Sequence, residues 1–98
     1  MFRLEPRHQK IVQQILSKYP YRFYAYGSRA KGTARKFSDL DVCFYEEIPW
    51  NILSHIEEDF EESDLPFKVE LVAWKWMSEK FKELIKKDLI LISQPNQV

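Results

Sequence analysis

The stretch Gly27-Ser28-Arg29-Ala30-Lys31-Gly32-Thr33-Ala34-Arg35-Lys36-Phe37-Ser38-Asp39-Leu40-Asp41-Val42 decides the fold. It contains both glycines of the chain and four basic side chains, and it ends in two aspartates one residue apart. Leu40 and Val42 flank the second aspartate, and Cys43-Phe44-Tyr45 continue the apolar run, which predicts a strand from about Asp39 to Tyr45. Because side chains alternate along a strand, we expect both aspartates on one face and the apolar residues on the other.

The paired aspartates and the preceding loop indicate a site for a metal ion and phosphate. Two carboxylates side by side repel each other unless a cation lies between them. Mg²⁺ prefers oxygen ligands, takes one or two carboxylates and completes its shell with substrate phosphates. Gly27 lets the backbone approach a phosphate closely, and Ser28 opens a short helix whose free N–H groups favour an anion. This combination points to nucleotide chemistry.

Simpler interpretations of the same residues stay open. A solvated turn before a strand would suit Asp39, whereas Asp41 lies inside the strand, where an unpaired carboxylate is costly. Ser28 could cap a helix and still serve a phosphate, since both roles can coexist. The basic loop could be an ordinary solvated surface. We expect at least one basic residue to meet a triphosphate, and the sequence does not decide among Arg29, Lys31, Arg35 and Lys36.

Gly27-Ser28, ten intervening residues and then Asp39-Leu40-Asp41 resemble the signature of the DNA polymerase β-like nucleotidyltransferases. The match is closest to their smallest branch, the minimal nucleotidyltransferases (MNT). The likeness extends to a Gly-Ser-x-Ala-x-Gly pattern and to Ser38 before the first aspartate. It covers most of the chain and implies transfer of a nucleoside monophosphate from a triphosphate, dependent on Mg²⁺. The residues that it implies for nucleotide binding are Gly27, Ser28, Arg29 and Lys31.

A third carboxylate is expected from a neighbouring strand. Two metal ions about 4 Å apart can stabilise the attacking and leaving oxygens together, and such a site usually needs a third acidic ligand. Alternation along the strand predicted from Phe67 to Ala73 separates Glu70 from the apolar Val69 and Leu71. The family more often has aspartate there, so a surface charge on an edge strand is the alternative. The predicted catalytic residues and metal ligands are Asp39, Asp41 and Glu70.

The apolar pattern predicts an α+β (α/β-like) fold in the order α-β-α-β-α-β-α, a small mixed sheet flanked by helices. This order is similar to the nucleotidyltransferase palm. The predicted helices run from Pro6 to Tyr19, briefly from Ser28, from Pro49, and from a cap at Ser78. The predicted strands are Tyr21–Tyr26, Asp39–Tyr45 and Phe67–Ala73, with a short strand over Asp88–Ile92 before a loose tail, Gln94–Val98.

Composition restricts the class of protein. We expect residues 1–98 to form one domain with a packed core, because 45% of the residues are hydrophobic and 15% are aromatic. The formal net charge of zero gives no global field toward nucleic acid or an anionic membrane, so direct nucleic-acid binding is not expected. The single cysteine fits a reducing compartment, and no stretch resembles a signal peptide or a membrane span. The predicted location is cytoplasmic.

The short chain leaves no room for the extra domains with which larger members of the superfamily hold their acceptor. We therefore expect a partner protein to present the acceptor hydroxyl. The resemblance to MNT antitoxins implies transfer of AMP from ATP to a tyrosine of a helical HEPN-domain toxin in a hetero-oligomer. The alternatives are a transferase for small molecules, as in aminoglycoside-modifying relatives, and a non-catalytic module that binds nucleotide or toxin. We expect the tryptophans mostly in the core, with some apolar surface left for another protein.

Overall fold

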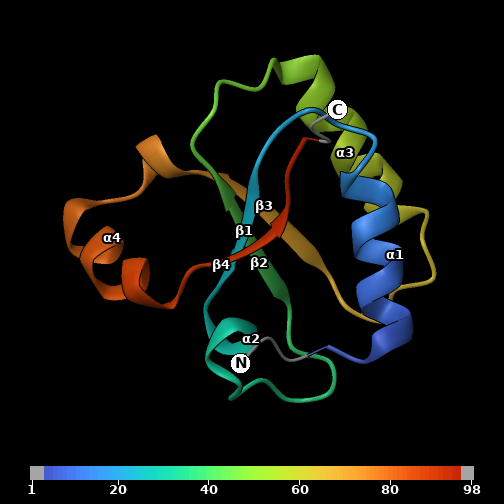
Figure 1. Cartoon of the computed structure of the whole chain (residues 1–98), viewed down its shortest axis with the longest axis horizontal. Helices are drawn as coiled ribbons and strands as arrows, with labels where there is room; N and C mark the ends of the chain where they lie inside the picture. The colour runs from blue at the N-terminus through green and yellow to red at the C-terminus, as the bar shows by residue number, and fades with distance from the viewer. Residues whose placement is uncertain (1–3, 96–98) are drawn as a thin grey trace.

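The computed structural model describes residues 4–95, which form a mixed four-stranded sheet with helices on both sides (Figure 1). The strands are β1 (Phe23–Tyr26), β2 (Leu40–Phe44), β3 (Val69–Ala73) and β4 (Ile90–Ser93), in the spatial order β3-β2-β1-β4. β1 pairs antiparallel with β2 and β4, whereas β2 and β3 are parallel. The predicted α+β class and order of elements are confirmed, and β4 follows the last helix.

The longer helices divide between the two faces of the sheet. α1 (Pro6–Leu16) and α3 (Trp50–Glu61) lie side by side on one face, and α4 (Glu79–Ile85) lies on the other (Figure 1). Two 3₁₀ turns flank α4, η1 (Trp74–Trp76) and η2 (Lys86–Asp88). The short α2 (Ser28–Lys31) follows β1 directly, so it begins at the end of a central strand.

Alternation along the central strands separates two cores. The larger core lies against α1 and α3 and buries the strand residues predicted for that face, namely Phe23, Ala25, Leu40, Val42 and Phe44. The smaller core contains Tyr26, Cys43 and, from α4, Ile85. Cys43 is fully buried and packs as a small apolar residue, as its position in the strand predicts. Hydrophobic burial on the first face therefore fixes which residues reach the second.

Several predicted boundaries differ from the structure. α1 ends at Leu16, and residues 17–20 form turns before β1. Asp39 lies just outside β2, which begins at Leu40 because the Leu40 N–H donates to the Lys68 carbonyl (2.9 Å). Ser78 caps α4 as predicted, accepting a hydrogen bond from the Phe81 N–H (3.1 Å). The end of the expected tail, residues 96–98, lies outside the described residues.

Two of the three tryptophans are not in the core, which corrects the expectation for them. Trp50 is 77% exposed and Trp76 is 80% exposed, whereas Trp74 is partly buried against Tyr45. Trp50 occupies the first position of α3 and Trp76 the last position of η1, so both lie at the end of an element. In the described part of the chain, no helix has the length and apolar character needed to cross a membrane.

The turn after α1 is tied to α3 by a hydrogen bond between side chains. The Tyr19 hydroxyl donates to Asp59 Oδ2 (2.5 Å), and Lys18 Nζ lies 3.0 Å from the same oxygen. Burial and the neighbouring Asp59 carboxylate raise the pKa of Tyr19 to about 12. The hydrogen bond from Tyr19 in turn lowers the pKa of Asp59. The contact fixes α1 against α3 on the face that holds the larger core.

Removal of this hydroxyl should destabilise the fold. Tyr19→Phe keeps the ring but leaves Asp59 without its phenol donor, so we expect a loss of about 1 kcal/mol in the free energy of unfolding. Urea denaturation measures the loss. Tyr21→Phe, which keeps the ring contact of Tyr21 with Phe23, is the matched control. Equal stability of Tyr19→Phe and wild type would show that the hydrogen bond adds nothing.

Candidate active site

Three side chains from three neighbouring strands meet on the α4 face of the sheet. The antiparallel register places Tyr26 opposite Asp41, and the parallel register places Asp41 opposite Glu70. Asp41 thus lies between a buried tyrosine and a second carboxylate. This register places Glu70 on the same face of the sheet as Asp41, and the role of Glu70 as a third metal ligand stays a prediction.

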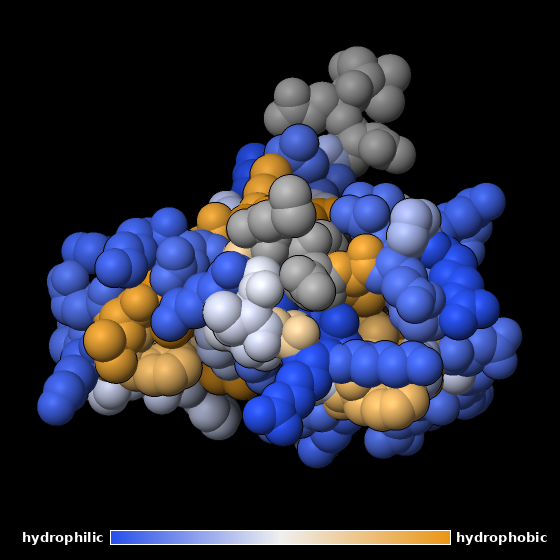
Figure 2. Space-filling model, turned by 90° about the horizontal axis from the view of Figure 1, so that it is seen from below, coloured by the Kyte–Doolittle hydropathy of each residue, from blue (hydrophilic) through white to orange (hydrophobic). Residues whose placement is uncertain are grey.

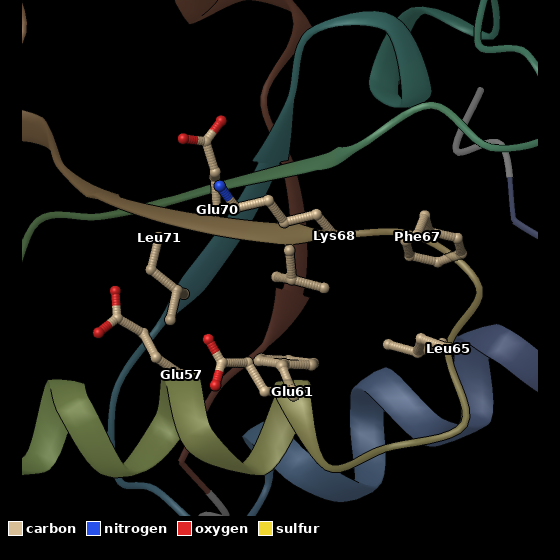
Figure 3. Close-up of a pocket in the computed structure, with 9 residues that line it drawn as sticks. Glu57, Glu61, Leu65, Phe67, Lys68, Glu70 and Leu71 are labelled. Carbon is tan, nitrogen blue, oxygen red and sulfur yellow. The ribbon is translucent and has the colours of Figure 1, made fainter.

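The close-up of β3 shows the direction of Glu70. Its carboxylate points away from α3, whereas Glu57 and Glu61 reach from α3 toward the sheet (Figure 3). A pocket of about 410 Å³ lies between α3 and the edge of β3, and its lining includes all three glutamates. The Glu70 carboxylate is exposed, so it can meet a ligand bound beside Asp41.

The half-buried Asp41 is the electrostatic centre of the cluster. Burial raises the pKa of Asp41, and the negative charges of Glu70 and Asp39 raise it further. Burial raises the pKa of Tyr26 to about 12, and the negative charges of Asp41 and Glu70 contribute to that rise. Among residues 4–95, no salt bridge involves any of the three acidic side chains. The cluster therefore favours either a proton or a bound cation.

The donors fit a cation that phosphates help to hold. Within the part of the chain that the structure describes, no group of three or more His, Cys, Asp or Glu side chains is arranged to hold a metal ion by itself. Mg²⁺ is commonly bound by only one or two carboxylates together with substrate phosphates. Asp41, aided by Asp39 or Glu70, offers such a partial set of oxygen ligands, and a cation would relieve the repulsion at Asp41.

Gly27 brings the loop backbone against the Asp41 carboxylate. Its φ of 76° and ψ of −154° belong to a region open essentially to glycine. A Cβ atom at this position would lie 2.7 Å from Asp41 Oδ2, too close for any other residue. The close neighbour of the Gly27 backbone is thus a carboxylate of the same site, and the approach of a phosphate to Gly27 stays a prediction. Gly27 is the N-cap of α2, so the alternative of Ser28 as capping residue is wrong, and Ser28 is the first helical residue.

The basic residues of the loop have different surroundings. Arg29 is only 5% exposed and lies inside the loop, whereas Lys31, Arg35 and Lys36 are exposed. The end of the molecule that carries α2 has a mainly hydrophilic surface with separate apolar patches (Figure 2). The guanidinium of Arg29 lies over the ring of Phe67, a contact that no local sequence pattern predicts because the two residues are far apart in the chain. Tyr26 was also missed as a neighbour of the site, although its position directly before Gly27 and its place in the strand pattern were available signals.

Comparisons with a family model and with a curated protein show the family of the chain. The family model for the nucleotidyltransferase domain matches residues 6–93. A protein of Haemophilus influenzae named "Probable protein adenylyltransferase MntA" is 42% identical over 86 residues, which cover 86% of this chain and 74% of that protein. A crystal structure from Sulfolobus solfataricus, described as a "putative nucleotidyltransferase", is 21% identical with a TM-score of 0.47 and covers 86% of this chain and 74% of its own. The chain belongs to the nucleotidyltransferase family and is a minimal nucleotidyltransferase, as the resemblance implied.

The raised pKa of Asp41 predicts a stability that depends on pH. Ionised Asp41 destabilises the folded state, so Asp41→Asn should raise the free energy of unfolding at neutral pH without divalent cations. The difference should shrink as the pH falls through the raised pKa, and it should vanish below the ordinary value of 3.8, where the carboxyl is protonated in both states.

Thermal or urea unfolding at several pH values measures this difference. Addition of Mg²⁺ with ATP should stabilise the wild type more than Asp41→Asn, since only the wild type keeps the carboxylate for the cation. Asp64→Asn, at an exposed carboxylate after α3, is the matched control. A neutral-pH wild type that is more stable than the Asn variant without cations would contradict the repulsion at Asp41.

Proposed function

We propose that this protein transfers AMP from ATP to a tyrosine hydroxyl of a HEPN-domain toxin and so acts as an antitoxin. The observation that carries the proposal is the position of Asp41 on β2, opposite Glu70 of β3 and against the backbone of Gly27. The similarity to a protein named as an adenylyltransferase supports AMP as the transferred group. The same similarity supports a protein as the acceptor. The cytoplasm is the compartment that fits ATP and such a partner.

Each residue of the site has a role in the proposed reaction. Asp39, Asp41 and Glu70 would hold Mg²⁺, as two ions if the site follows the two-metal pattern, and the metal would neutralise phosphate charge. The Gly27 backbone, Ser28 and the exposed Lys31 face the triphosphate. Glu70 accepts the proton of the attacking hydroxyl. A bond then forms between the hydroxyl oxygen and the α-phosphorus, the bond from that phosphorus to the bridging oxygen breaks, and pyrophosphate leaves.

Exposed aromatic side chains support a protein partner. Trp50 and Trp76 flank a pocket of about 440 Å³ between the start of α3 and the end of β3, with the half-exposed Tyr45 beside them. Large exposed aromatic residues around an apolar hollow are typical of protein interfaces. We assign this surface, defined here as the tryptophan surface, to binding of the HEPN-domain partner. Binding there would leave the α2 end of the sheet open for ATP.

The first test of the function concerns the three carboxylates. Asp41→Asn removes the central metal ligand and should lower AMP transfer by at least about 100-fold, because electrostatic stabilisation is a major catalytic term. Glu70→Gln keeps the shape but not the charge, so transfer should fall far more than ATP affinity does. Glu70→Asp restores the residue that is usual in the family and should keep measurable activity.

Transfer of label from α-labelled ATP, measured beside ATP affinity, separates the possible results. Full transfer by Glu70→Gln would make Glu70 a surface charge only. A wild type that binds ATP but transfers nothing, beside an active Glu70→Asp variant, would make the natural protein a binding module. Efficient labelling of aminoglycosides by the isolated chain would favour a small-molecule acceptor over a protein.

The tryptophan surface is tested by partner affinity. Trp50→Ser and Trp76→Ser should each weaken binding of the proposed HEPN-domain partner by about tenfold or more, as expected for aromatic anchors that become buried in an interface. Their unfolding temperatures should stay near that of wild type, because both side chains are exposed in the free protein. Calorimetric titration measures the affinity. Leu84→Ser on α4, also exposed, is the control, and unchanged affinity in both tryptophan variants would exclude this surface.

A further inference from the structure

Arg29 is the only charged or polar residue among those buried in the described part of the chain. It lies one residue after Ser28, in the segment where a basic side chain is expected to meet a triphosphate. Its burial separates it from the exposed Lys31, Arg35 and Lys36 of the same loop. Burial of a charged side chain is costly unless it makes specific contacts, so the contacts of Arg29 indicate its role.

The guanidinium group of Arg29 holds the backbone directly before the metal-site aspartates. Its Nε and Nη2 donate to the Ser38 carbonyl at 3.0 and 2.6 Å, and Nη2 also donates to the Lys36 carbonyl at 3.2 Å. The Ser38 carbonyl and the Asp39 nitrogen belong to one planar peptide unit. The two bonds to Ser38 therefore fix the orientation of the peptide from which Asp39 extends.

The same group also contacts the chain just before β3. The guanidinium carbon of Arg29 lies 4.2 Å from the centre of the Phe67 ring, close enough for a cation–π interaction. Phe67 is followed by Lys68, whose carbonyl accepts the hydrogen bond from Leu40 that opens the β2–β3 pairing. Beyond this point the register pairs Asp41 with Glu70. Arg29 thus touches both segments that carry the acidic residues.

We propose that Arg29 is a positioning residue that fixes the Ser38–Asp39 peptide against Phe67 and so sets the separation of Asp39 from Asp41 and Glu70. The inference rests on the proposed roles of these three carboxylates. Because Arg29 also belongs to α2, one side chain links the loop that faces phosphate to both acidic segments. Burial lowers the pKa of Arg29, whereas the negative charge of the nearby Asp39 acts to raise it. The two opposite charges therefore attract each other, and Arg29 partly neutralises the Asp39 carboxylate.

Arginine is required in this role because of its geometry. The planar guanidinium offers several N–H donors in one fixed plane while its face lies on an aromatic ring, and a lysine ammonium cannot do both. A phosphate ligand, in contrast, depends mainly on positive charge, which lysine supplies. Arg29→Lys therefore separates the two roles, and Lys31→Met on the exposed side of α2 provides the contrast expected for a phosphate contact.

Steady-state AMP transfer should show the separation. A positioning role predicts that Arg29→Lys lowers kcat by about 10- to 100-fold, as expected for misplaced catalytic groups, with little change in KM for ATP. Lys31→Met should instead raise KM for ATP. Phe67→Leu, which removes the ring but keeps an apolar side chain, should show a smaller effect of the same kind. The double variant should lose less than the sum of the single losses, since both changes break one contact.

Nuclear magnetic resonance of the protein without nucleotide gives a readout independent of activity. The Arg29 Nε–H signal should exchange slowly with solvent, and Arg29→Lys should shift the Asp39 amide signal while thermal unfolding shows the variant still folded. Addition of ATP with Mg²⁺ should move the Arg29 Nε–H signal little. A large shift of that signal, together with near-normal kcat and raised KM in Arg29→Lys, would overturn the proposal and make Arg29 a phosphate ligand.

The measurements also distinguish failure of the proposed function. If the wild type transfers no AMP, that function fails, while the protected Nε–H signal and the shifted Asp39 amide still support the positioning contact. If the wild type transfers AMP and Arg29→Lys matches it in kcat, KM and the Asp39 signal, only the positioning role fails. If Arg29→Lys does not fold, Phe67→Leu provides the test instead. An unchanged kcat and an unchanged Asp39 amide signal in Phe67→Leu would overturn the proposal.

Discussion

The site depends on the register between β2 and β3. Parallel pairing sets Asp41 opposite Glu70, and a slip of one residue would turn Glu70 toward α3 and away from the aspartate. The larger core enforces this register, because Leu40 and Val42 are fully buried on the α3 side while Val69 and Leu71 pack against that core. Hydrophobic burial on one face of the sheet therefore determines which carboxylates meet on the other. A substitution in the larger core that disturbs this register would therefore also disturb the site.

The arrangement places like charges together at the expense of stability. Asp41 is half-buried beside Glu70 and close to Asp39, and its raised pKa records the repulsion. Gly27 adopts a backbone conformation that is open essentially to glycine, and Asp41 Oδ2 lies too close to allow a side chain at that position. Contacts away from the site compensate, such as the Tyr19–Asp59 hydrogen bond between the turn after α1 and α3. Strain and repulsion concentrated in one place, with ordinary packing elsewhere, are typical of a functional site.

Sequence patterns predicted the parts of the site that depend on local periodicity. Alternation placed Asp41 and Glu70 on the face opposite Val42 and Leu71, and the glycine–serine pattern located the turn into α2. Contacts between distant segments were not predictable in this way, because nothing near Arg29 indicates that its guanidinium lies on Phe67. Exposure of Trp50 and Trp76 was missed for a related reason, since hydrophobicity favours burial but position at the end of an element decides it. Asp39 was placed inside the strand because the pattern cannot show where hydrogen bonding with β3 begins.

The incomplete set of metal ligands has a consequence for how the proposed reaction begins. No described cluster holds three acidic side chains in a metal-binding arrangement, and Mg²⁺ gives up its water only reluctantly. The free protein should therefore bind the ion weakly, and triphosphate oxygens should supply the missing ligands, so that ATP and Mg²⁺ favour each other's binding. By thermodynamic linkage, the repulsion at Asp41 that destabilises the free protein becomes affinity for the nucleotide with its cation. The hydrogen bonds from Arg29 to the Ser38 carbonyl serve this coupling, because they hold the Asp39 peptide in place before the nucleotide binds. Carboxylates that are already positioned need no further ordering when the cation and the triphosphate arrive, which increases the affinity for both.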